Sequence, residues 1–87
     1  MSKVKLQALL TEQLALEDPL FKLEKIGNKW AGSVISRSFR GKSDRQRQKM
    51  MRDVVDAELG ADSVQKVGTL LAYTPEEWDP DLTAKAG

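Results

Sequence analysis

The sequence of 87 residues contains neither cysteine nor histidine. Without cysteine, the chain forms no disulfide and offers no thiolate as a nucleophile or as a ligand of an iron–sulfur cluster. Without histidine, it lacks imidazole ligands for zinc and the base of most catalytic triads. Only oxygen ligands remain for a metal ion, and no Asp-rich loop of the EF-hand type is present. These absences argue against the common classes of enzyme, and we expect no cofactor on the isolated chain.

Long apolar runs and export features are also missing. No hydrophobic stretch approaches the roughly 18 residues of a membrane span, so no membrane partner is expected. The first ten residues, MSKVKLQALL, have neither the apolar core nor the cleavage site of a secretory signal, which favours a cytoplasmic protein. The length predicts one domain at residues 1–80, followed by a flexible tail at residues 81–87.

The net charge of +1 conceals a strong asymmetry along the chain. Residues 22–52 hold ten basic and two acidic side chains, whereas residues 53–87 hold two basic and eight acidic ones. We call residues 22–52 the basic segment. A local concentration of cations is typical of proteins that bind an anionic partner.

The first half of the chain predicts a helix followed by a hairpin. Ser2 can cap a helix from Lys3 to about Leu16, whose leucines recur at helical spacing. Phe21–Ile26 has the alternation of a strand, and Gly27-Asn28 is typical of a two-residue type II′ turn. The return strand is expected from Lys29 to about Phe39, and glycine at position 32 either weakens it or marks a close approach.

The second half predicts a helix, a strand and a short final helix. Ser43 and Gln46 form a capping box that opens a helix ending at Leu59, with Gly60 beyond it. Val64–Tyr73 has the nearly continuous apolar character of a buried strand. A second capping box at Thr74-Pro75-Glu76-Glu77 begins a short helix that contains Trp78.

The predicted fold class is α+β, with the element order α-β-β-α-β-α. The tight turn makes the first two strands antiparallel, and a helical crossover makes the third strand parallel to the second. A three-stranded mixed sheet covered by helices on one face follows. Met50 and Met51 fit the core-facing side of the long helix, and Trp30 is expected to cover the sheet, with base stacking as the alternative.

Two motifs in this order resemble the BolA family, whose fold is similar to the type II KH domain. The first runs Phe39-Arg40-Gly41-Lys42-Ser43 and continues to Arg47; the second is Thr74-Pro75-Glu76-Glu77-Trp78. In the family, Phe-x-Gly-x-Ser leads into a helix carrying Arg-His, and Thr-Pro-Glu-x-Trp follows the last strand. The resemblance spans the chain from Leu6 to Trp78. It implies a non-enzymatic adaptor or regulator, with a monothiol glutaredoxin as its partner.

Two positions depart from the family pattern. Gln48 stands where the family has histidine after the helix arginine, and Lys66 stands eight residues before Thr74, where the family has a second histidine. The family shares a two-iron, two-sulfur cluster with the glutaredoxin through that second histidine. A protonated lysine has no lone pair, so the chain would not supply this ligand. The resemblance nevertheless implies that Lys66 and Trp78 lie near the partner surface.

Nucleic acid is the alternative partner, because the fold is KH-like and the loop before the long helix is basic. DNA or RNA phosphates would meet a group of seven residues, which we call the predicted anion group: Arg40, Lys42, Ser43, Arg45, Arg47, Lys49 and Arg52. The turn at residues 41–44 lacks the second glycine of the KH signature. A competing interpretation is a solvated helix face, partly neutralised by Asp53 and Asp56 at i, i+4 spacing.

Overall fold

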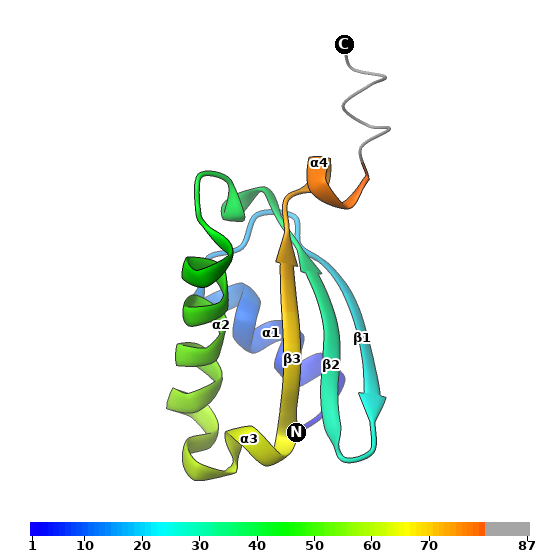
Figure 1. Cartoon of the computed structure of the whole chain (residues 1–87). Coiled ribbons are helices and arrows are strands. Elements are labelled where there is room, and N and C mark those ends of the chain that lie inside the picture. Colours follow the sequence, from blue (N-terminus) through cyan, green and yellow to red (C-terminus); the bar gives the residue numbers. More distant parts are fainter. Residues whose placement is uncertain (80–87) are drawn as a thin grey trace.

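The computed structural model describes residues 1–79. The predicted end of the domain at residue 80 and the predicted tail at residues 81–87 therefore lie outside the described residues. The elements, shown in Figure 1, follow in this order: α1 (Lys3–Gln13), β1 (Leu20–Ile26), β2 (Lys29–Ile35), the 3-10 helix η1 (Arg37–Phe39), α2 (Asp44–Leu59), the 3-10 helix η2 (Gly60–Asp62), α3 (Ser63–Lys66), β3 (Val67–Tyr73) and α4 (Pro75–Trp78).

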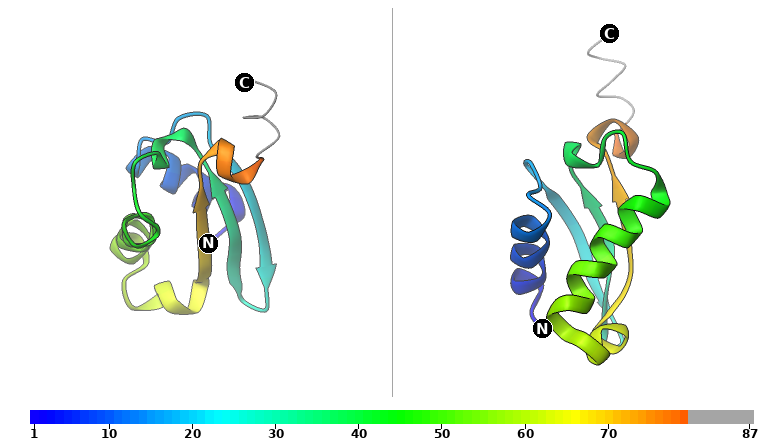
Figure 2. Two further views of the ribbon diagram at one scale, coloured as in Figure 1. Left: turned by 45° about the horizontal axis from the view of Figure 1, so that its top comes forward. Right: turned by 90° about the vertical axis from the view of Figure 1, so that its left-hand side faces the viewer.

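The three strands form one mixed sheet in the order β1-β2-β3. β1 pairs antiparallel with β2, and β3 pairs parallel with β2, so both predicted pairings are confirmed. α1 lies against one face of the sheet, and α2 runs along the same side and beside β3 (Figures 1 and 2). Within residues 1–79 no helix lies over the opposite face, except α4 at the end of β3. We call this opposite face the open face.

The three helix starts that the sequence predicts are confirmed. The Ser2 hydroxyl accepts a hydrogen bond from the backbone N–H of Lys5 at 3.1 Å. Ser43 and Gln46 exchange both bonds of a capping box at the start of α2. Thr74 and Glu77 do the same at the start of α4. Each motif satisfies orphan backbone donors locally, which is why the sequence alone could locate it.

The second strand is shorter than predicted: β2 ends at Ile35 rather than at about Phe39. The Ser36 hydroxyl donates to the backbone oxygen of Glu17 at 2.9 Å and accepts from the backbone N–H of Ser38 at 3.1 Å. These bonds turn the chain into η1, which delivers the fully buried Phe39 side chain to the core.

The third strand begins at Val67 rather than at Val64, because η2 and α3 occupy residues 60–66. Gly60 ends α2 with a positive φ of 60°. The Ser63 hydroxyl then donates to Asp56 Oδ1 at 2.5 Å and holds this segment against α2. α3 adds one short helix to the predicted order. The first helix also ends early, at Gln13, before Ala15 adopts a positive φ of 50°.

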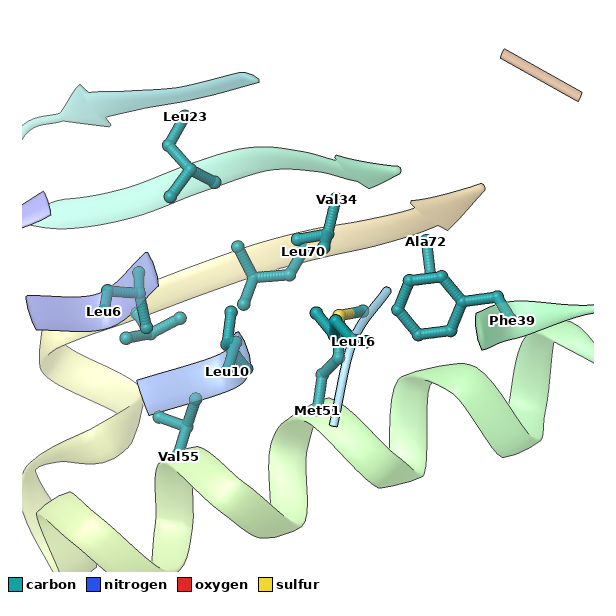
Figure 3. Packing of buried hydrophobic residues seen from close by; sticks show 11 residues of the cluster. Leu6, Leu10, Leu16, Leu23, Val34, Phe39, Met51, Val55, Leu70 and Ala72 are labelled. Atoms are coloured by element: carbon teal, nitrogen blue, oxygen red, sulfur yellow. The ribbon is translucent and has the colours of Figure 1, made fainter. Parts of the chain in front are cut away.

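The core lies between the sheet and the two long helices (Figure 3). Leu6 and Leu10 of α1 and Met51 and Val55 of α2 meet the sheet side chains. Met50 is only partly buried at the edge of this cluster. Trp30 also packs against the core, as expected, and its Nε1–H donates to the backbone oxygen of Met1 at 3.0 Å. None of the helices within residues 1–79 has the length and apolarity needed to cross a membrane.

Gly32 marks a close approach between β1 and β2. Its φ is 144°, and a Cβ at this position would overlap the backbone oxygen of Lys22. We expect Gly32→Ala to lower the free energy of unfolding by about 2–4 kcal/mol, because the overlap and the unfavourable φ act together. Urea denaturation monitored by circular dichroism would measure the loss.

Gly68→Ala is the matched control for this glycine. Gly68 lies in the adjacent strand, and its added Cβ would meet no atom closer than 3.7 Å. We expect Gly68→Ala to change the free energy of unfolding by less than about 1 kcal/mol. Equal destabilisation by the two substitutions would contradict the close approach at Gly32.

Candidate functional site

Four of the six cations in the predicted anion group already have carboxylate partners. These ion pairs are Arg40 with Glu76, Arg47 with Glu77 at 2.6 Å, Lys49 with Asp53 at 2.8 Å, and Arg52 with Asp56 at 3.9 Å. The last two are the i, i+4 pairs expected for a solvated helix face. Much of the charge in the basic segment is therefore balanced within the fold.

Arg47 has a structural position rather than an exposed one. Its side chain is 7% exposed, and Nη1 donates to Glu77 Oε1 at 2.6 Å and to the backbone oxygen of Ala72 at 3.3 Å. The backbone N–H of Thr74 and then Arg47 lower the pKa of the Glu77 carboxyl. Arg47 thus connects α2, β3 and α4 through one guanidinium group.

Three α2 side chains donate hydrogen bonds to backbone oxygens on the outer edge of β3. Arg47, Gln48 and Arg52 donate to alternate backbone oxygens of the strand, those of Ala72, Leu70 and Gly68, at 3.3, 2.6 and 3.3 Å. Unpaired groups on an edge strand invite pairing with other chains, so these bonds protect the edge. Gln48, where the BolA resemblance places a histidine, serves as one of the three donors. This arrangement was not predictable from the sequence, because the donors on α2 and the acceptors on β3 lie at least 16 residues apart.

The loop before α2 is held to α4 by Arg40 and Glu76. The hydrogen bond from Arg40 is the main cause that lowers the pKa of the Glu76 carboxyl. Ser43 accepts from the Gln46 backbone N–H at 3.2 Å, so its hydroxyl is engaged in the helix cap. Within residues 1–79, Lys42 and Arg45 are the two cations of the predicted anion group without an ion pair.

The two predicted partner-binding residues lie at opposite ends of β3. Lys66 is exposed at the end of α3, just before the strand. Trp78 follows the strand in α4 and packs on Tyr73, with ring centroids 5.4 Å apart. The seven residues of β3 span about 20 Å, so one small contact would not include both residues.

An apolar surface on the open face was not predicted from the sequence. Leu20 pairs with Ile35 across β1 and β2, and Ile35 pairs with Tyr73 across β2 and β3. Leu71 lies two residues before Tyr73 on the same face, and Trp78 covers the Tyr73 ring. We call these five residues the open-face patch. Leu20, Leu71 and Trp78 remain 46%, 43% and 41% exposed around the buried Ile35, and large apolar side chains exposed on one face are typical of an interaction site.

Within residues 1–79, no group of three or more metal-ligating side chains could hold a metal ion. The chain also has no cysteine or histidine at any position, and lysine stands at residue 66, where the BolA resemblance places the family's ligand. Its residues therefore do not fit the shared iron–sulfur cluster of the family.

No model of a known protein family and no curated protein matches the sequence. Solved structures do match. A bol-like protein from Babesia bovis is 20% identical, with a TM-score of 0.63 and 94% of each chain covered. The BolA domain of SufE1 from Arabidopsis thaliana is 18% identical, with a TM-score of 0.65 over 88% of this chain and 98% of that one. A bolA protein homologue from Coxiella burnetii is 16% identical, with a TM-score of 0.65 over 91% and 97%. The BolA-like fold inferred from the sequence is therefore confirmed.

The buried position of Arg47 can be tested against that of Arg45, which is exposed on the same helix. We expect Arg47→Met to lower the free energy of unfolding by about 2–4 kcal/mol, because the substitution removes the donor to the Ala72 carbonyl and the cation that pairs with the Glu77 carboxylate. Arg45→Met should change it by less than about 0.5 kcal/mol. Urea denaturation of both variants measures the difference. A similar decrease in the free energy of unfolding for the two variants would show that the Arg47 contacts do not stabilise the fold.

Proposed function

We propose that this chain is a BolA-like, non-enzymatic adaptor that binds a monothiol glutaredoxin through the open-face patch. The similarity of this chain to BolA structures supports the adaptor class. One of those structures is a BolA domain that forms part of another protein, SufE1. The family resemblance assigns the partner surface to the third strand and the last helix. Leu71, Tyr73 and Trp78 belong to these two elements.

One observation carries this proposal: Leu20, Leu71 and Trp78 remain exposed on a sheet face that, within residues 1–79, no helix covers except α4 at the end of β3. Burying three side chains that are each more than 40% exposed would provide the apolar centre of a protein interface. Charge contributes little there, because the nearby Arg40 and Glu76 already neutralise one another. Binding should therefore depend only weakly on salt.

The proposed adaptor would not donate a ligand to a cluster held by its partner. Lys66 presents an ammonium group, and the chain offers no thiolate or imidazole elsewhere. Its contribution to a glutaredoxin complex would be surface contact and exclusion of water, with every thiolate supplied by the partner side.

Nucleic-acid binding is the second candidate function, favoured by Lys42 and Arg45. Both cations lack an ion pair within residues 1–79 and flank the start of α2. Two phosphate contacts would give a slope of log affinity against log salt of about −1.4 to −1.8. The six cations of the predicted anion group would have given about −4 to −5. The ion pairs within the fold thus weaken this candidate.

The proposal is tested by titrating the chain with a monothiol glutaredoxin at low and physiological salt, using isothermal titration calorimetry. We expect affinities that differ less than about threefold between the two conditions, because the contact is mainly apolar. Leu71→Glu should weaken binding at least about tenfold by placing a charge in the interface.

Val4→Glu is the matched control, since Val4 is a 74% exposed aliphatic residue on α1. It should leave the affinity unchanged. Equal weakening by both substitutions, or no binding at either salt concentration, would refute the open-face patch as the interface. Binding to labelled oligonucleotides whose salt slope Lys42→Ala with Arg45→Ala flattens would favour the second candidate.

A further inference from the structure

A small pocket lies at the end of the molecule opposite α4. The β1–β2 hairpin, α3 and the start of the chain come together there (Figure 1). The pocket has a volume of about 180 Å³ and is lined by Met1, Lys25, Asn28, Trp30, Gln65 and Lys66. In the sequence, Lys66 stood out as a substituted metal ligand and a partner-binding residue, and nothing connected it with the hairpin.

The lining of this pocket is rich in hydrogen-bond donors and carries uncompensated positive charge. Lys25 and Lys66 supply two ammonium groups, and Asn28 and Gln65 supply two side-chain amides. No carboxylate is among the lining residues. Neither lysine has an ion pair within residues 1–79, in contrast to Arg47, Lys49 and Arg52 on α2. An anion in this pocket would be attracted by both ammonium groups.

One side of the pocket is formed by Trp30, whose side chain is fixed in position. Trp30 packs against the core, and its Nε1–H is bonded to the Met1 backbone oxygen at 3.0 Å. Lys25 Nζ lies 5.7 Å from the centroid of the Trp30 ring, a cation–π contact that places its ammonium group beside the pocket. A side chain that is positioned before binding loses less freedom when a ligand arrives.

We propose that this pocket binds a phosphate dianion, either free or as a small phosphomonoester. The charge favours phosphate over a carboxylate, because a phosphate group carries about −1.5 to −2 at pH 7 and meets two ammonium groups. The types of residue in the lining also favour phosphate. Lysine binds phosphate as a point charge, whereas a planar carboxylate matches the two parallel N–H donors of an arginine guanidinium.

The size of the pocket limits the ligand. A cavity of about 150 Å³ accommodates benzene, so 180 Å³ holds a phosphate group with a short substituent. Pockets for drug-sized ligands begin at about 300 Å³, which excludes a whole nucleotide from the interior. The site lies at the far end of β3 from the open-face patch, so it does not depend on the proposed glutaredoxin contact.

Trp30 provides a direct readout once the second tryptophan is replaced. In a Trp78→Phe background, we expect inorganic phosphate to change Trp30 fluorescence saturably at constant ionic strength, and sulfate to act in the same way. Acetate should bind at least about tenfold more weakly. Lys25→Met and Lys66→Met should each weaken phosphate binding about tenfold, because each removes one charge-assisted contact.

Lys22→Met is the matched control, because Lys22 lies three residues from Lys25 on β1 and therefore faces the other side of the sheet. It should leave the phosphate affinity unchanged, and circular dichroism should show that all variants are folded. Glycerol 2-phosphate separates the two sources of the ligand: tighter binding than phosphate indicates a small organic phosphate, and equal binding indicates the free anion. The proposal is overturned by a signal that does not saturate, by affinity that survives both pocket substitutions, or by acetate binding as tightly as phosphate.

Discussion

The contact between α2 and the outer edge of β3 determines the rest of the structure. Three side chains of one helix donate to three alternate carbonyl oxygens of one strand, and two of the donors are guanidinium groups. Hydrogen bonds to charged groups each contribute about 1.5–3 kcal/mol, so this contact is large beside the total stability of a small domain. It fixes α2 along the strand and turns Met51 and Val55 toward the core.

The same contact explains why the basic segment is not one uniform binding surface. Arg47 is drawn into the fold and then holds α4 through Glu77, while Arg40 repeats the connection on the surface through Glu76. Two pairs of cations without an ion pair within residues 1–79 stand far apart in the fold. Lys42 and Arg45 stand at the start of α2, and Lys25 and Lys66 line the pocket at the other end of the molecule. The net charge of the basic segment therefore overstates the number of cations that a single partner can contact.

Features encoded by neighbouring residues were predictable from the sequence. The capping boxes at Ser43 and Thr74 join groups only three residues apart, and the Gly27-Asn28 turn sets the hairpin register locally. The parallel pairing of β3 followed from the long helical connection between β2 and β3, which has room for a crossover. The BolA resemblance rested on short motifs of the same local kind. It could therefore be recognised even though the chain is only 16–20% identical to the three BolA-like structures described above.

Features that depend on distant residues were not predictable. The end of β2 is set by Ser36 bonding to Glu17, 19 residues earlier, and the burial of Arg47 depends on Glu77, 30 residues later. The open-face patch needs the register of three strands before Leu20, Ile35 and Tyr73 become neighbours. The phosphate pocket likewise joins the hairpin to α3, which the sequence interpretation had assigned to a strand.

The central claim is that a protein partner docks on the open face rather than on the basic loop. Nuclear magnetic resonance of the ¹⁵N-labelled chain, titrated with an unlabelled monothiol glutaredoxin, tests it most directly. The account predicts that the largest amide shift changes fall on Leu20, Leu71, Tyr73 and Trp78, with little change at residues 42–49. Shift changes confined to residues 40–49, with the open-face patch unaffected, would contradict it.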